Sequence, residues 1–155
     1  MVPEPVARVK YALIVLGAED TVTVFDSTVP TAAAAAAALG CKVAAITNSL
    51  VFDLEGAPLL ILASGAARVD VRKVAAQLGA GRIRRASPEF VLEHTGQEVG
   101  GVAPVGHPEK IKTLLDESLR VHEVLWAGAG DHHSMFSISY DELRRITAAR
   151  EMPVR

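Results

Sequence analysis

The sequence predicts an α/β fold of the mixed α+β kind, in which helices surround a mostly antiparallel mixed sheet. Three observations lead to this fold class. Helical and extended patterns are interleaved along the chain, so both kinds of element belong to one structure. Two almost continuously apolar segments, 43–52 and 58–63, flank a polar turn that contains Gly56, which is typical of a β-hairpin. Further strand patterns come late in the chain, which favours a mixed sheet over a regular doubly wound one.

The first part of the chain is expected to form a helix, a strand and a second helix before the hairpin. Residues 5–16 place Val6, Val9, Leu13 and Leu16 on one stripe, as an amphipathic helix does. Residues 21–25 alternate and are rich in β-branched side chains, which predicts a strand. The seven-alanine run at 32–38 predicts a helix that Thr31 can cap and that ends at Gly40.

After the hairpin the sequence again predicts helices and strands in alternation. Ser87 and Pro88 have the residue types of a helix N-cap and first turn. Residues 108–115 are compatible with either a strand or a helix. The other predicted elements are helices at 69–78, 88–94 and 140–149, and strands that start near Ile83 or cover 121–127 and 135–138.

The composition predicts one domain over residues 1–155. Half of the 155 residues are hydrophobic and 22% are charged, which is typical of a globular protein. The formal net charge of −2 argues against coating DNA or RNA through bulk charge. The single cysteine, Cys41, excludes an internal disulfide and, with no signal peptide evident, favours the cytoplasm. No apolar run reaches the roughly 18 residues that cross a membrane.

Several common functional motifs are absent from the sequence. No glycine-rich dinucleotide or phosphate-binding loop follows a strand, and no serine stands in a nucleophile elbow. Neither paired cysteines nor an HExxH pattern occurs. His132 and His133 are adjacent, so on a strand they would point to opposite faces. We therefore expect no metal and no organic cofactor.

The segment Gly100–His107 is the first candidate for function. Its three glycines and Pro104 suit neither a helix nor a strand interior. Such a loop can bring bare backbone N–H groups close to a ligand in a narrow apolar pocket. The alternative is an ordinary glycine-rich connection.

Five segments in this order resemble the YbaK/ProX family, the free-standing and synthetase-appended aminoacyl-tRNA editing domains. They are Thr31 with the alanine-rich helix and Gly40, Ile46–Phe52, Ser64–Asp70, Thr95–Gln97, and Gly100–Gly106, the last resembling the family's GxxxP loop. The resemblance implies a curved mixed sheet. It also implies hydrolysis of the ester between a mischarged amino acid and the 3′-terminal adenosine of tRNA, particularly tRNA for proline.

The chain departs from the family at one position. Characterised members carry a lysine where Asn48 stands here, before Ser49 and Leu50. Asparagine can position a carbonyl, an amine or a 2′-hydroxyl, but it has no charge and no useful pKa. The resemblance to an asparagine-bearing branch implies a trans-editing deacylase for a small amino acid. The alternative is a non-catalytic module that binds aminoacyl-tRNA or a synthetase and has lost the lysine.

The resemblance assigns roles to individual residues. Backbone N–H groups of the loop could form an oxyanion hole, and His133 could position water or take a proton; an exposed turn histidine is the alternative. Asp70 could bind the substrate amine or merely cap a helix, and Asn48 could make only a structural hydrogen bond. The catalytic candidates are Asn48, Gly100, Gly101 and His133. The substrate-binding candidates are Thr31, Ser49, Ser64, Gly65, Asp70, Val102, Ala103, Pro104, Gly106 and His107.

Basic residues offer a second kind of contact with tRNA. Arg82, Arg84 and Arg85 are clustered, and Lys110 and Lys112 follow the loop. They could meet acceptor-stem phosphates, although a solvated charged edge is the alternative.

Overall fold

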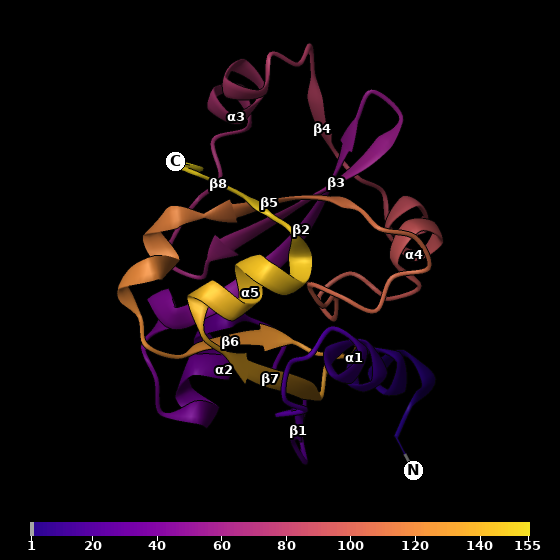
Figure 1. Ribbon diagram of the computed structural model, residues 1–155, viewed down its shortest axis with the longest axis vertical. Coiled ribbons are helices and arrows are strands. Elements are labelled where there is room, and N and C mark those ends of the chain that lie inside the picture. The colour runs from indigo at the N-terminus through magenta and orange to yellow at the C-terminus, as the bar shows by residue number, and fades with distance from the viewer. Residues whose placement is uncertain (1) are drawn as a thin grey trace.

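The computed structural model describes residues 2–155, which form five α-helices and one eight-stranded mixed sheet (Figure 1). The helices are α1 (Glu4–Val15), α2 (Ala32–Leu39), α3 (Val71–Leu78), α4 (Pro88–Thr95) and α5 (Tyr140–Thr147). The strands are β1 (Thr23–Val24), β2 (Ile46–Leu54), β3 (Ala57–Ser64), β4 (Ile83–Arg85), β5 (Lys112–Asp116), β6 (Leu125–Gly128), β7 (Ser134–Ile138) and β8 (Arg150–Met152). The predicted mixed α/β fold class is confirmed.

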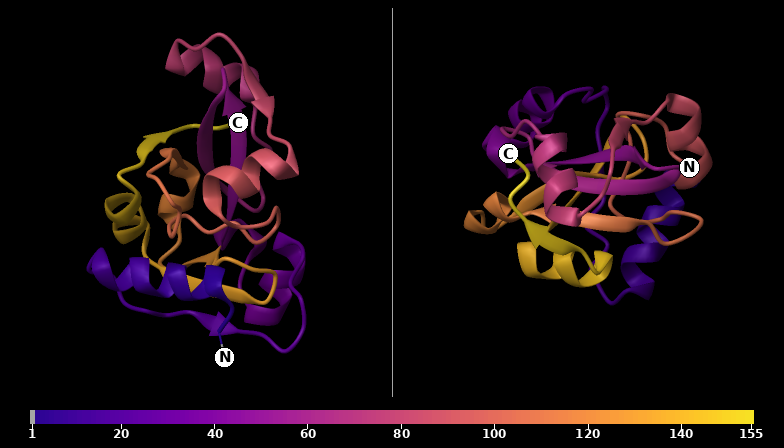
Figure 2. Two further views of the ribbon diagram at one scale, coloured as in Figure 1. Left: turned by 90° about the vertical axis from the view of Figure 1, so that its right-hand side faces the viewer. Right: turned by 90° about the horizontal axis from the view of Figure 1, so that it is seen from above.

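The β2–β3 hairpin is the centre of the sheet. Strand order is β1-β7-β6-β2-β3-β5-β8, and β4 also pairs with β2. The antiparallel pairs are β1–β7, β2–β3, β2–β4 and β6–β7, while β2–β6, β3–β5 and β5–β8 are parallel. In the left view of Figure 2 the hairpin stands upright, with α3 and β4 around its upper end and α1 across the lower end.

One edge of β2 is only partly covered, and this gap positions the site. The edge opposite β3 pairs with β6 at residues 46–47 and with β4 at residues 52–54. Residues 48–51 between these ladders pair with β3 alone. At about 3.3 Å per residue this unpaired edge is roughly 13 Å long. Alternate residues of a strand direct their N–H and C=O groups to opposite edges, so two of these four residues present backbone groups to the gap.

Local chemistry fixes the helix ends, as the sequence predicts. The Thr31 hydroxyl accepts a hydrogen bond from Ala34 N at 3.0 Å, and Gly40 ends α2 with φ of 67°. The Ser87 hydroxyl caps α4 in the same way by accepting from Phe90 N at 3.1 Å. Satisfying the free N–H groups of the first turn is what favours these residue types at helix starts.

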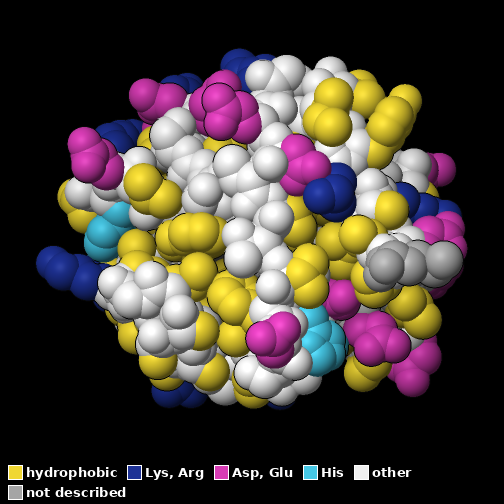
Figure 3. All heavy atoms as spheres, turned by 90° about the horizontal axis from the view of Figure 1, so that it is seen from below, with side chains coloured by type: hydrophobic (Ala, Val, Ile, Leu, Met, Phe, Trp, Pro, Cys, Tyr) yellow, Lys and Arg dark blue, Asp and Glu magenta, His cyan; other side chains and the backbone are white. Residues whose placement is uncertain are grey.

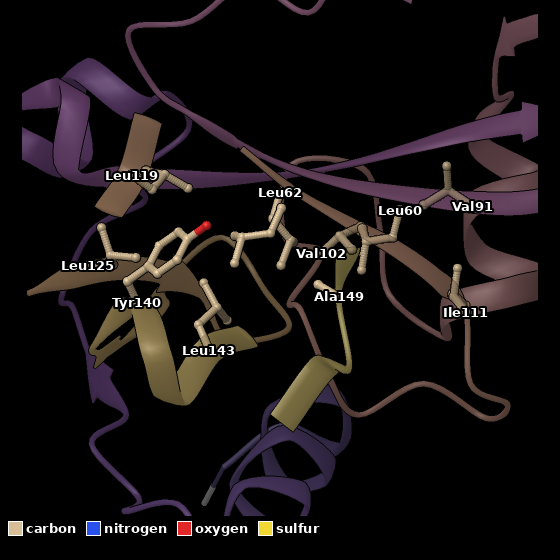
Figure 4. Close-up of a cluster of buried hydrophobic side chains, with 11 residues drawn as sticks. Leu60, Leu62, Val91, Val102, Ile111, Leu119, Leu125, Tyr140, Leu143 and Ala149 are labelled. Carbon is tan, nitrogen blue, oxygen red and sulfur yellow. The ribbon is translucent and has the colours of Figure 1, made fainter. Parts of the chain in front are cut away.

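The apolar core lies on both faces of the hairpin because successive side chains of a strand point to opposite faces. On one face Leu60 and Leu62 of β3 pack with Tyr140 and Leu143 of α5, as Figure 4 shows. On the other face Leu59, Ile61 and Ala63 pack with Val74 of α3. These two clusters hold β2 and β3 rigidly from both sides.

Some predicted elements differ from the observed ones. The strand expected at 21–25 is only Thr23–Val24, and residues 43–45 form a 3-10 turn ahead of β2. The strand expected at 121–127 begins at Leu125, because a 3-10 segment, Glu117–Val121, precedes it; the Asp116 carboxylate starts that segment by accepting from Ser118 N at 2.9 Å. The ambiguous stretch 108–115 forms β5, and β8 has no counterpart in the prediction. Within residues 2–155 no helix is long and apolar enough to cross a bilayer.

Candidate active site

A cavity of about 900 Å³ lies along the unpaired edge of β2. We call it the edge cavity. Residues 46–52 of β2 line it from within the sheet. The other lining segments are the start of α2 (Thr31, Ala32, Ala35), the turn after β3 (Arg68, Val69), β4 and the start of α4 (Ile83, Arg85, Pro88, Val91), the glycine loop (Val99, Gly100, Val102) and the β6–β7 turn with β7 (Gly128, Asp131, Ser134, Met135).

The glycine loop has two free amides in residues that line the edge cavity. Gly101 N already donates to Glu98 O at 2.9 Å, and Ala103 N donates to the Gln97 side chain at 2.7 Å. The N–H groups of Gly100 and Val102 donate to no acceptor within residues 2–155. Both residues line the cavity. The expected oxyanion donors are therefore narrowed to Gly100 and Val102, because the amides of Gly101 and Ala103 are occupied.

Two glycines let the loop lie directly against the β6–β7 turn. A Cβ on Gly101 would stand 2.8 Å from Asp131 Cα, and a Cβ on Gly128 would stand 3.0 Å from Val102 O. Neither contact leaves room for a side chain without moving backbone. The Val102 side chain anchors the loop in the core beside Leu60 and Leu62 (Figure 4).

Gln97 holds the second half of the loop in place through hydrogen bonds to the backbone of Ala103 and Val105. Its side chain is 1% exposed, accepts from Ala103 N at 2.7 Å and donates from Nε2 to Val105 O at 3.4 Å. The Thr95 hydroxyl in turn accepts from Gln97 N at 3.0 Å. The Thr95-Gly96-Gln97 segment is thus a support for the loop and not part of the cavity lining.

Asn48 is half-buried and lines the edge cavity. Register places it opposite Ala63, on the face of the sheet that also carries Leu50. Its side chain makes no hydrogen bond with another residue of the described chain, so the structural bond considered from the sequence is not present within residues 2–155. A polar side chain in this position is free to bind a ligand.

Three hydroxyl groups at the edge cavity are buried and unpartnered within residues 2–155. They belong to Thr47, Ser49 and Ser134. Thr47 lies opposite Ala127 of β6, and Ala127 lies opposite Phe136 of β7, so Thr47 and Phe136 point to the same face of the sheet. Ser49 and Ser134 each lie two residues from one of them along the same strand and therefore point to that face as well. Buried hydroxyls in folded proteins nearly always have a hydrogen-bond partner, so this cluster marks a polar part of the site. Ser49 was expected from the sequence; Thr47 and Ser134 were not.

Three further candidates have structural contacts and do not line the edge cavity. The Ser64 hydroxyl donates to Ala44 O at 2.8 Å. A Cβ on Gly65 would stand 2.6 Å from Val43 O and 2.9 Å from the Ala32 side chain, which explains this glycine by packing. Asp70 caps α3 by accepting from Lys73 N at 3.1 Å. For Asp70 the structure supports the capping alternative over amine binding.

The last part of the loop faces away from the edge cavity. Ala103 and Pro104 are buried, and Gly106 and His107 line a separate cavity of about 550 Å³ against α1. His107 Nε2 lies 2.8 Å from Ala103 O. Burial lowers the pKa of His107, and the contact with Ala103 only partly opposes this. His107 therefore favours its neutral form and supports the loop through Nε2–H.

None of the three nearby histidines lines the edge cavity. The His133 side chain is exposed, and its backbone N donates to Asp131 Oδ1 at 2.9 Å. His132 comes nearest, because its Cε1 would stand 2.8 Å from a Cβ on Gly100. The structure thus does not bring His133 together with Asn48 and the free amides. No group of three or more His, Cys, Asp or Glu side chains in residues 2–155 could hold a metal ion.

The charges around the edge cavity are few and separated in the fold. Asp131, in the β6–β7 turn, is the only acidic residue that lines it within the described chain. Arg68, after β3, and Arg85, on β4, are its only basic residues. Neither arginine forms an ion pair within residues 2–155. Sequence reasoning missed Asp131, although it directly follows the Gly128-Ala129-Gly130 turn that ends a predicted strand.

The fold and the cavity define a mixed α/β domain with a cavity beside a gap in its sheet. The chain belongs to the aminoacyl-tRNA editing domain family, whose model matches residues 26–146. This confirms the resemblance drawn from the sequence and makes the chain an aminoacyl-tRNA editing domain.

Individual relatives agree with this family. A candidate trans-editing enzyme for prolyl tRNA synthetase has a crystal structure that superposes with a TM-score of 0.94 and 35% identity, covering 100% of this chain and 99% of that one. The uncharacterized protein YwhH of Bacillus subtilis is 33% identical over 85% of this chain and 84% of its own length. The proline–tRNA ligase of Lysinibacillus sphaericus is 32% identical over 60% of this chain, which matches only 16% of that enzyme.

Proposed function

We propose that this chain is a deacylase that acts in trans on tRNA carrying a mischarged small amino acid. The observation that carries the proposal is the pair of free amides, Gly100 and Val102, in residues that line the same cavity as Asn48. The family and the trans-editing neighbour support the same reaction class. The substrate places the activity in the cytoplasm, where tRNA is charged and used.

The proposed reaction is hydrolysis of the ester to the terminal ribose. Water adds to the carbonyl carbon, and the carbonyl oxygen becomes an oxyanion that accepts hydrogen bonds from the Gly100 and Val102 amides. One such donor is worth about 10²–10³ in rate. The bond to the ribose oxygen then breaks, and the proton released by the water passes to that oxygen. The products are the free amino acid and uncharged tRNA.

Asn48 has a positioning part in this scheme. Its amide can donate to the ester or accept from the attacking water, but it supplies neither a charge nor a proton at neutral pH. An aminoacyl ester is already reactive, so orientation and oxyanion stabilisation can suffice. The side chains of Ala32, Ala35 and Met135 narrow the apolar part of the cavity and favour a small acyl group.

The tRNA backbone would contact the two arginines that line the cavity. Arg68 and Arg85 carry the positive charge that phosphate groups need. Of the basic cluster predicted from the sequence, only Arg85 lines the cavity. The lower face of the molecule carries mostly hydrophobic side chains in its middle, with Lys and Arg mainly near the rim (Figure 3). That face is therefore a poor choice for RNA.

A panel of tRNAs charged with alanine, serine, cysteine or threonine tests the proposal. We expect the wild type to hydrolyse at least one of them faster than buffer does, and Asn48→Ala to lower kcat/KM at least tenfold. Gln77→Ala, which removes an exposed amide outside the cavity, is the matched control and should leave kcat/KM unchanged. No hydrolysis of any member would overturn the deacylase and favour the alternative, a module that binds aminoacyl-tRNA or a synthetase. An unchanged rate for Asn48→Ala would remove Asn48 from the mechanism.

A further inference from the structure

The carboxylate of Asp131 is the one negative charge on the edge cavity wall within residues 2–155. Its Oδ1 accepts from His133 N at 2.9 Å, which fixes the side chain in the β6–β7 turn. Its other oxygen has no hydrogen-bond partner in the described chain. A half-buried carboxylate with one free oxygen at a cavity is a site for a cation.

An aminoacyl ester brings such a cation with it. Its α-amine is protonated near neutral pH, and it is attached to the carbon next to the ester carbonyl. A site for this ammonium group must therefore adjoin the site for the oxyanion. The structure meets this condition, because Gly101 packs directly on the backbone of Asp131, where an added Cβ would stand 2.8 Å from Asp131 Cα. The free amides of Gly100 and Val102 flank that contact.

We propose that Asp131 binds the α-ammonium group of the substrate's amino acid. The inference rests on the proposed deacylase function and adds to it the residue that recognises the amine. It replaces Asp70, whose carboxylate caps α3.

Arg85 fixes the direction in which the substrate lies. Asp131 belongs to the turn after β6, which pairs with the beginning of β2, whereas Arg85 belongs to β4, which pairs with its end. The unpaired edge of about 13 Å separates the two ladders. An aminoacyl nucleotide has the same polarity, with an ammonium group at one end and a phosphodiester at the other. The amino acid thus lies at the β6–β7 end, and the nucleic acid leaves past Arg85 at the β4 end.

Asp131→Asn tests the assignment with little change of shape. Asparagine keeps the oxygen that accepts from His133 N and removes only the charge. The substrates are the aminoacyl-tRNA that the wild type hydrolyses fastest and its α-hydroxyacyl counterpart, which is lactyl-tRNA for alanine. Asp53→Asn is the matched control, because Asp53 also accepts a turn N–H, from Gly56 at 2.7 Å, and lies outside the cavity.

We expect Asp131→Asn to lower kcat/KM for the aminoacyl-tRNA about 10- to 100-fold, the usual effect of losing a hydrogen bond between charged groups. The hydroxyacyl substrate should change by less than threefold, and Asp53→Asn should change neither. Equal losses on both substrates, or no loss on either, would overturn the role of Asp131. Wild-type protein that hydrolyses no charged tRNA would instead overturn the proposed function, so the two failures are distinguishable.

Discussion

Gln97 offers a direct test of how the glycine loop is held in place. Replacing it by glutamate keeps the size of the side chain and the oxygen that accepts from Ala103 N. The ionised form can no longer donate to Val105 O and places a charge where the native side chain is 1% exposed. The protonated form can both accept from Ala103 N and donate to Val105 O, because its O–H group takes the place of the Nε2–H group of glutamine. Gln97→Glu should therefore be tolerated only when the new carboxyl is protonated.

The size of the effect follows from the pH. Burial raises the pKa of the introduced carboxyl in the folded state, so the folded state binds the proton more tightly than the unfolded one. The stability loss is then small below the unfolded pKa of about 4.3 and grows as pH rises. Keeping the carboxyl protonated in the folded state costs at most about 1.36 kcal/mol for each pH unit above the unfolded pKa of about 4.3. The cost is therefore about 1 kcal/mol at pH 5 and about 3.7 kcal/mol at pH 7.

Thermal unfolding at the two pH values measures this difference. At about 2–4 °C per kcal/mol for a chain of this size, Gln97→Glu should lower Tm by roughly 2–4 °C at pH 5 and by up to about 15 °C at pH 7, relative to wild type at the same pH. Gln77→Glu is the matched control, because Gln77 also donates to a carbonyl, Pro153 O at 3.3 Å, but is exposed. An equal loss for Gln97→Glu at both pH values would refute the reasoning.

Two further substitutions test the cavity wall and the helix cap. Gly101→Ala places a Cβ 2.8 Å from the backbone of Asp131 and should lower kcat/KM about 10- to 100-fold by displacing the free amides. Gly81→Ala is the control, because its Cβ would meet only the flexible Glu55 side chain and should have little effect on kcat/KM. Equal kcat/KM values for the two variants would contradict the role assigned to the loop. Asp70→Ala removes the N-cap of α3 and should lower the free energy of unfolding by about 1 kcal/mol while kcat/KM stays unchanged. A tenfold loss of kcat/KM at unchanged Tm would instead show that Asp70 takes part in substrate binding.

Local chemistry explains which elements the sequence predicts well. Thr31 and Ser87 act on the helix turn that follows them, so their residue types reveal helix starts without knowledge of the rest of the fold. The hairpin is equally local. By contrast, β8 is a three-residue strand with no alternating pattern, and it exists because its backbone pairs with β5. Pairing between segments about 35 residues apart in sequence cannot be read from either segment alone.

The site was predictable in part for the same reason. The loop Gly100–Gly106 is recognisable from its glycines, and Asn48 from its polar type in an apolar strand. Which loop amides remain free depends on Glu98 O and on the Gln97 side chain, and these contacts appear only in three dimensions. The exposed position of His133 depends on the geometry of the β6–β7 turn.

The edge cavity exists because two strands are short. β6 ends at Gly128, where a Cβ would stand 3.0 Å from the loop carbonyl of Val102. β4 ends at Arg85, opposite Phe52, and does not continue toward residue 51. A longer β6 would continue along β2, pair with residues 48–51 and fill the gap. An uncovered edge in the middle of a sheet leaves backbone donors and acceptors unpaired, which is costly when they are buried. An aminoacyl group, with a carbonyl and an ammonium on adjacent carbons, offers partners of both kinds. The interruption of the sheet and the substrate that we propose are therefore chemically matched.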